Sequence, residues 1–330
     1  MFRQAQHDSL RDERAFSTAL RKPYNTMAQF NSEHQTDWKE ILQRLSRIRE
    51  QSDYTNANVD FIRENLLSSD ERIRGGAVLA ATGCLFEQHI IDLLSTIAEE
   101  DDSTGVRKAA VQSLGGVIEE GVEQGLEDED FEPEDMEEWE EFQTETLQQE
   151  YLRIKDLMLG ILQNEEEDLE VRDIVLYNLS SLGFSEYIRY WISEFFDSPH
   201  QSSQITAVKS MGKYPYHWEN ELETLIDPKT AKPVLMEAIS ASYSSESPQL
   251  AERIENVLTS SNPDAEVICY ALPVLANINL TKNLGELLQE FSLHSNEKVQ
   301  EAAKAAIEVF TKKSFDKYLH DELGMDDVDI

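Results

Sequence analysis

The sequence predicts an all-α protein, an α-solenoid of about seven helix–turn–helix repeats stacked in a right-handed superhelical array. The first observation is an internal repeat with a period of about 33 residues, which is the length of one two-helix unit. The second is that apolar and small residues recur at helical spacing after each repeat start. The third is that no useful stretch shows the strict apolar–polar alternation of a β-strand.

The repeat is clearest in residues 68–83, 100–116 and 164–183. Each copy has acidic residues, an apolar residue followed by arginine, a small or apolar residue four positions later, and glycine about ten positions later. The apolar–arginine pairs are Ile73-Arg74, Val106-Arg107 and Val171-Arg172, and weaker copies start at Ile205, Val234, Val267 and Val299. Successive anchors are separated by roughly one period, except that the interval from Val106 to Val171 holds roughly two.

Each anchor begins the second helix of a repeat. Small or apolar residues follow at positions +4, +7 and +8, which lie on one helix face. Glycine at the end of several copies suits the left-handed conformation that closes a helix. The first helix of each pair is an amphipathic segment ahead of the anchor, at 56–67, 87–99, 147–162, 185–196, 217–226, 248–260 and 281–294.

The ends of the array need caps, because a solenoid otherwise exposes its core. Apolar residues at helical spacing from Trp38 to Ile48 predict a capping helix over 37–50. We therefore divide the chain into an N-terminal arm (1–36), the capping helix and first repeats (37–118), an acidic insertion (119–146), the remaining repeats (147–312) and an acidic C-terminal tail (313–330).

The composition argues against several classes of function. The chain of 330 residues holds 65 acidic and 29 basic residues, a formal charge of −36. Such a charge argues against binding nucleic acid or an anionic membrane surface, both of which require Lys and Arg. No apolar run is long enough for a membrane helix, and the N-terminus lacks the apolar core of a secretory signal. Two cysteines without a CxxC motif, Cys84 and Cys269, are typical of a reducing compartment, so we expect a cytoplasmic protein.

The negative charge is concentrated. Residues 119–150 contain 16 acidic residues and no basic residue. We expect a loop over 119–132 and one long helix over 133–162, with Pro133 in its first turn and with Trp139 and Phe142 on its N-terminal half. Three interpretations remain open: a solvated loop with Trp139 against the core, a recognition element for a basic partner, or an autoinhibitory helix in the groove of the array itself.

Nine aromatic residues lie between 184 and 218, a density that fits either a packed core or an interface. The stretch Tyr214-Pro-Tyr-His-Trp falls at a turn between helices, where rings are harder to bury. The candidate protein-binding residues are therefore Trp139, Phe142, Tyr190, Trp191, Tyr214, Tyr216, His217 and Trp218.

The motifs D-x-x-I-R (Asp70–Arg74), V-R-K-A-A (Val106–Ala110) and D-x-x-V-R (Asp168–Arg172) resemble the HEAT-repeat family, in particular the short bacterial HEAT-like repeats also found in phycobilisome lyases. The resemblance covers roughly 56–312. It implies a ladder of aspartate and arginine side chains along the solenoid, to which Asp70, Asp102, Asp168, Arg74, Arg107 and Arg172 correspond. The later repeats depart from this pattern, since Thr206, Leu235, Ile268 and Gln300 follow their anchors.

No motif indicates catalysis. No histidine is followed by glutamate, whereas the HEAT-repeat di-iron hydroxylases carry repeated His-Glu pairs, and neither HExxH, GxSxG, GxxxxGK[ST] nor GxGxxG occurs. We therefore predict no catalytic, cofactor-binding or metal-binding residues, no cofactor, and no enzymatic activity.

The predicted function is a protein–protein interaction scaffold or regulatory adaptor. A partner, expected to be basic, would bind in a concave groove lined by the second helices and at the acidic insertion. The alternative is an enzyme similar to a bilin lyase, which the repeat resemblance suggests. A nucleic-acid protein is a further alternative, because Arg44, Arg47 and Arg49 form a basic cluster. The partner's identity, the pathway and the oligomeric state are left open by the sequence.

Overall fold

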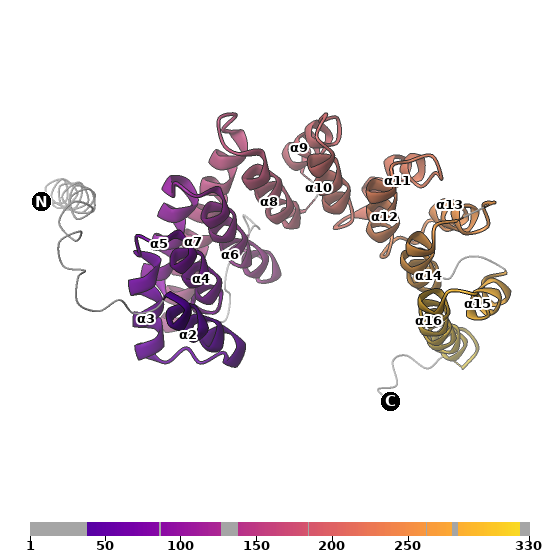
Figure 1. Ribbon diagram of the computed structural model, residues 1–330, viewed down its shortest axis with the longest axis horizontal. Helices are drawn as coiled ribbons and strands as arrows, with labels where there is room; N and C mark the ends of the chain where they lie inside the picture. The colour runs from indigo at the N-terminus through magenta and orange to yellow at the C-terminus, as the bar shows by residue number, and fades with distance from the viewer. Residues whose placement is uncertain are drawn as a thin grey trace, which may run out of the picture. The chain divides into compact units, whose positions relative to one another are not determined.

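The computed structural model describes residues 38–85, 87–126, 138–183, 185–261, 263–278 and 283–323, with only the backbone for 138–147 and 316–323 (Figure 1). All regular structure in these ranges is helical. The α-helices are α2 (Trp38–Gln51), α3 (Asn56–Leu66), α4 (Glu71–Ala81), α5 (Gln88–Glu100), α6 (Thr104–Glu123), α7 (Glu138–Gln163), α8 (Leu169–Leu179), α9 (Glu186–Phe196), α10 (Gln201–Met211), α11 (Glu219–Leu225), α12 (Lys232–Ala241), α13 (Pro248–Leu258), α14 (Ala265–Ile278), α15 (Leu284–Ser292) and α16 (Glu297–Leu323). The short 3₁₀ turns are η3 (Thr82–Cys84), η4 (Ser180–Leu182) and η5 (Pro215–His217).

The chain divides into two compact units, Met1–Ala80 and Ala81–Ile330. In the first unit, α2 is the predicted capping helix. Its Leu45 and Ile48 are buried, and the guanidinium of Arg44 lies 3.7 Å from the ring centroid of Phe61 on α3. The side chain of Leu42 fills the space beside Gly76 of α4, so all three helices share one small core.

The second unit consists of two layers of helices (Figure 1). Helices α5, α7, α9, α11, α13 and α15 form the first helix layer, and α6, α8, α10, α12, α14 and α16 form the second helix layer. Each second-layer helix packs on the first helix of its own pair and on the next helix of its own layer. Paired helices stacked in this way are a HEAT-like α-solenoid, as the repeat predicts.

The repeats share one packing register. The anchor positions are all buried and are occupied by Ile73, Val106, Val171, Ser203, Val234, Val267 and Val299. Four residues later the side chain is fully buried and almost always alanine, in Ala77, Ala110, Val175, Ala207, Ala238, Ala271 and Ala303. A methyl group at this point lets neighbouring second helices approach closely, which explains why the sequence repeats a small residue here.

The prediction of Ile205 as an anchor was wrong by two residues. Ile205 is only half-buried, whereas Ser203 is fully buried at the anchor position. The Gln204 amide donates to the carbonyl of Ser198 at 2.9 Å, as Arg74 donates to Ser68 and Arg107 to Asp101 in the earlier repeats. With Ser203 as the anchor, the intervals back to Val171 and on to Val234 become nearly equal.

Two boundaries differ from the prediction. Helix α6 continues to Glu123, so residues 119–123 are helical where a loop was predicted. Helix α16 continues to Leu323, well into the segment predicted as a tail. The predicted long helix over 133–162 is present as α7, which begins at Glu138, and residues 127–137 lie outside the described part of the chain.

The helices on either side of the insertion are packed directly on each other. The ring of Tyr151 on α7 is 1% exposed and lies against Gly121 of α6, where a Cβ atom would overlap it. The acidic segment therefore begins and ends on a fixed part of the second unit.

Candidate protein-binding surfaces

Three of the acidic residues that precede second helices cap those helices. Asp70 accepts the backbone N–H of Arg72 at 3.0 Å, and Asp168 accepts that of Glu170 at 3.0 Å. Asp101 and Asp227 accept the backbone N–H groups of Ser103 and Lys229, which lie ahead of α6 and α12 and outside these helices. Asp264 caps α14 by accepting the backbone N–H of Glu266 at 2.9 Å. A carboxylate in this position satisfies a free helical N–H and opposes the positive end of the helix dipole. These acids thus have a role in the fold.

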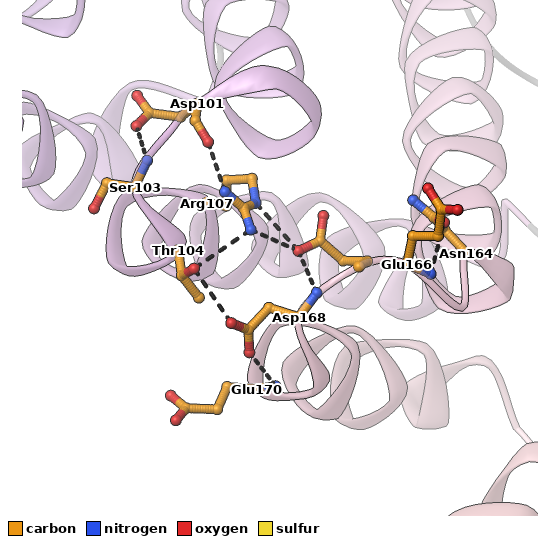
Figure 2. Close-up of polar contacts among 9 residues, drawn as sticks. Asp101, Ser103, Thr104, Arg107, Asn164, Glu166, Asp168 and Glu170 are labelled. Carbon is orange, nitrogen blue, oxygen red and sulfur yellow. Dashed lines mark hydrogen bonds and ion pairs between the residues drawn. The ribbon is translucent and has the colours of Figure 1, made fainter.

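One arginine of the predicted ladder, Arg107, pairs with a glutamate and not with an aspartate, at the junction of α6 and α8 (Figure 2). Glu167 Oε1 accepts from Arg107 Nη2 at 2.8 Å and Nε at 3.2 Å, and from the backbone N–H of Asp168 at 2.7 Å. Arg107 also donates to the carbonyl of Asp101 at 2.7 Å. The two side chains are only 15% and 9% exposed, so this is a largely desolvated ion pair.

Two predicted ladder residues have other partners, and a third is exposed. Asp168 caps α8 and accepts a hydrogen bond from the hydroxyl of Thr104 at 3.3 Å, while Glu167 takes the arginine. Asp102 is exposed, and the carboxylate of Asp101 beside it accepts the backbone N–H of Ser103. The Arg172 Nε donates to the carbonyl of Leu162 at 3.0 Å, and its guanidinium faces aromatic rings. Asp168 was predicted as the partner of an arginine, whereas its carboxylate accepts from Thr104 and from the Glu170 N–H, and Arg107 binds Glu167.

Exposed rings gather on α9 next to Arg172. Tyr187 and Tyr190 are 39% and 54% exposed, and each packs edge-on against the half-buried Trp191, with centroids 6.4 Å and 5.3 Å away. The Arg172 guanidinium lies 5.8 Å from the Trp191 centroid. We call Tyr187, Tyr190 and Trp191 the α9 aromatic cluster. It contains two of the predicted residues, and Tyr187 was not predicted.

The stretch around η5 is only partly a surface. Trp218 is 3% exposed, so its prediction as a binding residue was wrong: the 3₁₀ turn directs this ring into the core ahead of α11. The Tyr214 hydroxyl donates to the carbonyl of Ser181 at 3.1 Å. Tyr216 is 62% exposed, and its ring lies tilted against the ring of the exposed His217, with the centroids 4.1 Å apart. Trp139 and Phe142 lie on α7 outside the residues whose side chains are described.

The two layers of the second unit differ in charge. The first-layer helices contain 18 acidic and 4 basic residues, whereas the second-layer helices contain 13 and 10. Most of the excess negative charge on the helices therefore belongs to the first layer. The sequence did not reveal this separation, because it requires assigning every helix to a layer.

The second layer carries a basic spot that sequence reasoning missed. Helix α10 has no acidic residue, and its Lys209 lies beside Lys213 in the following turn. Both ammonium groups approach the ring of Tyr177 on α8, at 4.1 Å and 5.0 Å from its centroid. The signal available in the sequence was two lysines four residues apart on an otherwise uncharged helix.

One buried carboxyl lies between α8 and α10. Asp173 is 7% exposed, and its Oδ1 has no hydrogen-bond partner among the described residues. Burial raises the pKa of this carboxyl, while the hydroxyls of Ser203 and Ser202 oppose the shift. The charged form is therefore less stable in the folded chain than in the unfolded chain.

We expect Asp173→Asn to raise the free energy of unfolding by about 1 kcal/mol at neutral pH, because it removes a poorly compensated buried charge. A raised pKa in the folded state means that the wild-type penalty appears as pH rises through that pKa and is absent below the unfolded pKa. The gain should therefore shrink toward zero below about pH 4. Urea unfolding of both proteins across this pH range measures it, and a gain that does not change with pH would contradict the explanation.

Neither a metal site nor a membrane helix is found in the part of the chain described here. No group of three or more His, Cys, Asp or Glu side chains is arranged to hold a metal ion within these ranges. No helix in the same ranges is long and apolar enough to span a membrane.

Neither a protein-family model nor a curated protein matches the chain. Solved structures with a similar arrangement of helices include YibA from Escherichia coli, at 13% identity over 83% of this chain and 92% of that chain, with a TM-score of 0.47. Human deoxyhypusine hydroxylase is similar at 12% identity over 79% and 99%, with a TM-score of 0.35. The complex of CpcE and CpcF of phycocyanin lyase from Nostoc is similar at 15% identity over 76% and 94%, with a TM-score of 0.35. At these values the likeness concerns helical repeats alone.

Proposed function

We propose that this chain is a non-enzymatic, cytoplasmic interaction scaffold that binds a basic segment of a protein partner on its first helix layer. The observation that carries the proposal is a row of side chains on α9. Glu186, Tyr190 and Glu194 are all exposed, and their spacing of four residues aligns them on one helix face. The rest of the α9 aromatic cluster supports the central ring.

This row has the chemistry that a lysine or arginine side chain requires. A guanidinium stacked on the Tyr190 ring gains a cation–π interaction, and the two carboxylates lie one turn away on either side. The rings offer a rigid apolar contact, which is the usual anchor of a protein interface. A segment with alternating basic and apolar residues fits this surface.

The acidic insertion contributes at longer range in this proposal. Charges near a binding site raise the rate of association more than they strengthen the final contacts. Eight acidic residues lie between 127 and 137, next to helices whose positions are fixed by Gly121 and Tyr151. The basic partner is placed on the first layer, rather than in the predicted groove along the second helices, because the first layer has the larger excess of acids.

The test is binding of a short fluorescent peptide of Lys, Arg and Leu residues to the full chain. Tyr190→Ala should weaken binding about tenfold, as expected for a central ring in an interface. Tyr270→Ala is the matched control, because Tyr270 is similarly exposed, at 48%, but lies on α14 of the second layer. Equal affinities of the Tyr190→Ala variant and the wild type would refute this site.

A kinetic measurement shows whether the acidic insertion acts at long range or contacts the peptide directly. Changing the eight acids between 127 and 137 to their amides should slow association and weaken its salt dependence, with little change in the dissociation rate. A faster dissociation rate instead would mean that these acids contact the peptide directly.

A further inference from the structure

A second surface lies at α10, on the second helix layer. It is basic, and it therefore favours an acidic ligand and not a basic one. Lys209 is the only charged residue of α10, and Lys213 follows in the next turn. The two ammonium groups converge on the Tyr177 ring of the neighbouring helix, at 4.1 Å and 5.0 Å from its centroid. In a chain with a net charge of −36, a convergent pair of cations without acids on its own helix is exceptional.

Each lysine of the pair has one acidic neighbour. Lys213 lies 3.6 Å from a carboxylate oxygen of Glu119 on α6. On the other side, Glu237 of α12 is half-buried, and burial raises the pKa of its carboxyl while Lys209 opposes the shift. Lys213 lies in the turn after α10, and both ammonium groups approach the same ring. Like charges this near to each other repel, so an added anion at this point reduces the repulsion.

The surface beside the lysines can also hold apolar side chains. Glu237 and Tyr270 occupy the same register position in successive second-layer helices, three residues after the anchors Val234 and Val267. Tyr270 is 48% exposed, and so is Tyr243 at the end of α12. Tyr270 therefore belongs to the same helix layer as Lys209, and Tyr243 follows the next helix of that layer.

We propose that Lys209 and Lys213 anchor an acidic segment of a partner protein, with apolar residues of that segment against Tyr243 and Tyr270. The argument is charge complementarity. The second-layer helices are close to electrically balanced, whereas the first-layer helices carry a large excess of acids that repels such a segment. The array would then bind basic and acidic segments on opposite layers.

The experiment measures fluorescence anisotropy of a short labelled peptide of Glu, Asp and Leu residues with the full chain, at about 50 and about 300 mM salt. We expect binding that weakens with salt and falls about tenfold or more in Lys209→Gln/Lys213→Gln. The matched control is Lys298→Gln/Lys304→Gln, which removes two exposed lysines from α16 of the same layer and should change the affinity less than about twofold. Circular dichroism confirms that each variant is folded.

Three results would overturn the proposal: no binding to the wild type at low salt, equal losses in both double variants, or binding that appears only after the acids between 127 and 137 are neutralised. In the last case the occupant would be the chain's own acidic segment. The proposal is independent of the basic-partner site, because Tyr190→Ala should leave binding of the acidic peptide unchanged and Lys209→Gln/Lys213→Gln should leave binding of the basic peptide intact.

Discussion

Replacing Glu167 with alanine should lower the free energy of unfolding by about 3 kcal/mol, because it leaves the buried charge of Arg107 without its partner. One oxygen of Glu167 accepts from two nitrogens of this guanidinium and from the backbone N–H of Asp168. All three hydrogen bonds are lost together. Water cannot replace them without opening the junction between α6 and α8, since both side chains are largely buried.

The matched control is Glu170→Ala, three residues further along. Glu170 pairs with Lys108 across the same junction, but its side chain is 63% exposed, so the loss should be at most about 1 kcal/mol. Urea denaturation measures both changes, and hydrogen exchange of the α6 and α8 amides localises them. Equal destabilisation by the two substitutions would show that burial does not set the strength of this pair.

Gly121→Ala should destabilise the chain by a similar amount, about 3 kcal/mol, by overpacking the contact between α6 and α7. An added Cβ overlaps the Tyr151 ring, and that ring has no room to withdraw, since it is 1% exposed. Either the ring leaves its position or the two helices separate. The unfolding midpoint in urea measures the loss.

Gly160→Ala on α7 is the control, because no heavy atom lies within 4 Å of the added Cβ. Alanine should stabilise this helix by about 0.5–1 kcal/mol, since it loses less backbone freedom than glycine. Replacing the ring with a smaller side chain, in Gly121→Ala/Tyr151→Leu, should recover part of the lost stability. Such a recovery would identify the contact with Tyr151 as the cause. If Gly121→Ala behaves like Gly160→Ala, the two helices are not in close contact.

The repeat architecture could be predicted because its signal is redundant. Buried anchors recur once per period in the repeats outside the insertion. One anchor assigned to the wrong residue therefore does not change the predicted fold. The one error of register, at Ile205, arose because the true anchor is Ser203, a polar residue that an apolar pattern passes over. The burial of Ser203 and the hydrogen bond from Gln204 to the preceding turn reveal the equivalence.

The candidate surfaces were less predictable, because exposure depends on tertiary packing. Tyr190 and Trp218 are both aromatic residues in the same dense stretch, yet one is 54% exposed and the other 3%. Trp218 directly follows the 3₁₀ turn η5, in which Tyr216 is 62% exposed, so neighbouring rings differ in exposure within one turn. The contact of Lys209 and Lys213 with Tyr177 could not be recognised from the sequence, because Tyr177 lies on α8, one full repeat earlier in the chain.

The row of buried alanines also bears on how such a chain can change length. The same position in four successive second-layer helices is occupied by Ala207, Ala238, Ala271 and Ala303. Each of these helices therefore packs on the next through a similar surface. Interfaces between repeats that are built alike can replace one another. Duplication or loss of one unit in the gene would therefore preserve the packing on both sides, and selection could lengthen or shorten the array without redesigning its core.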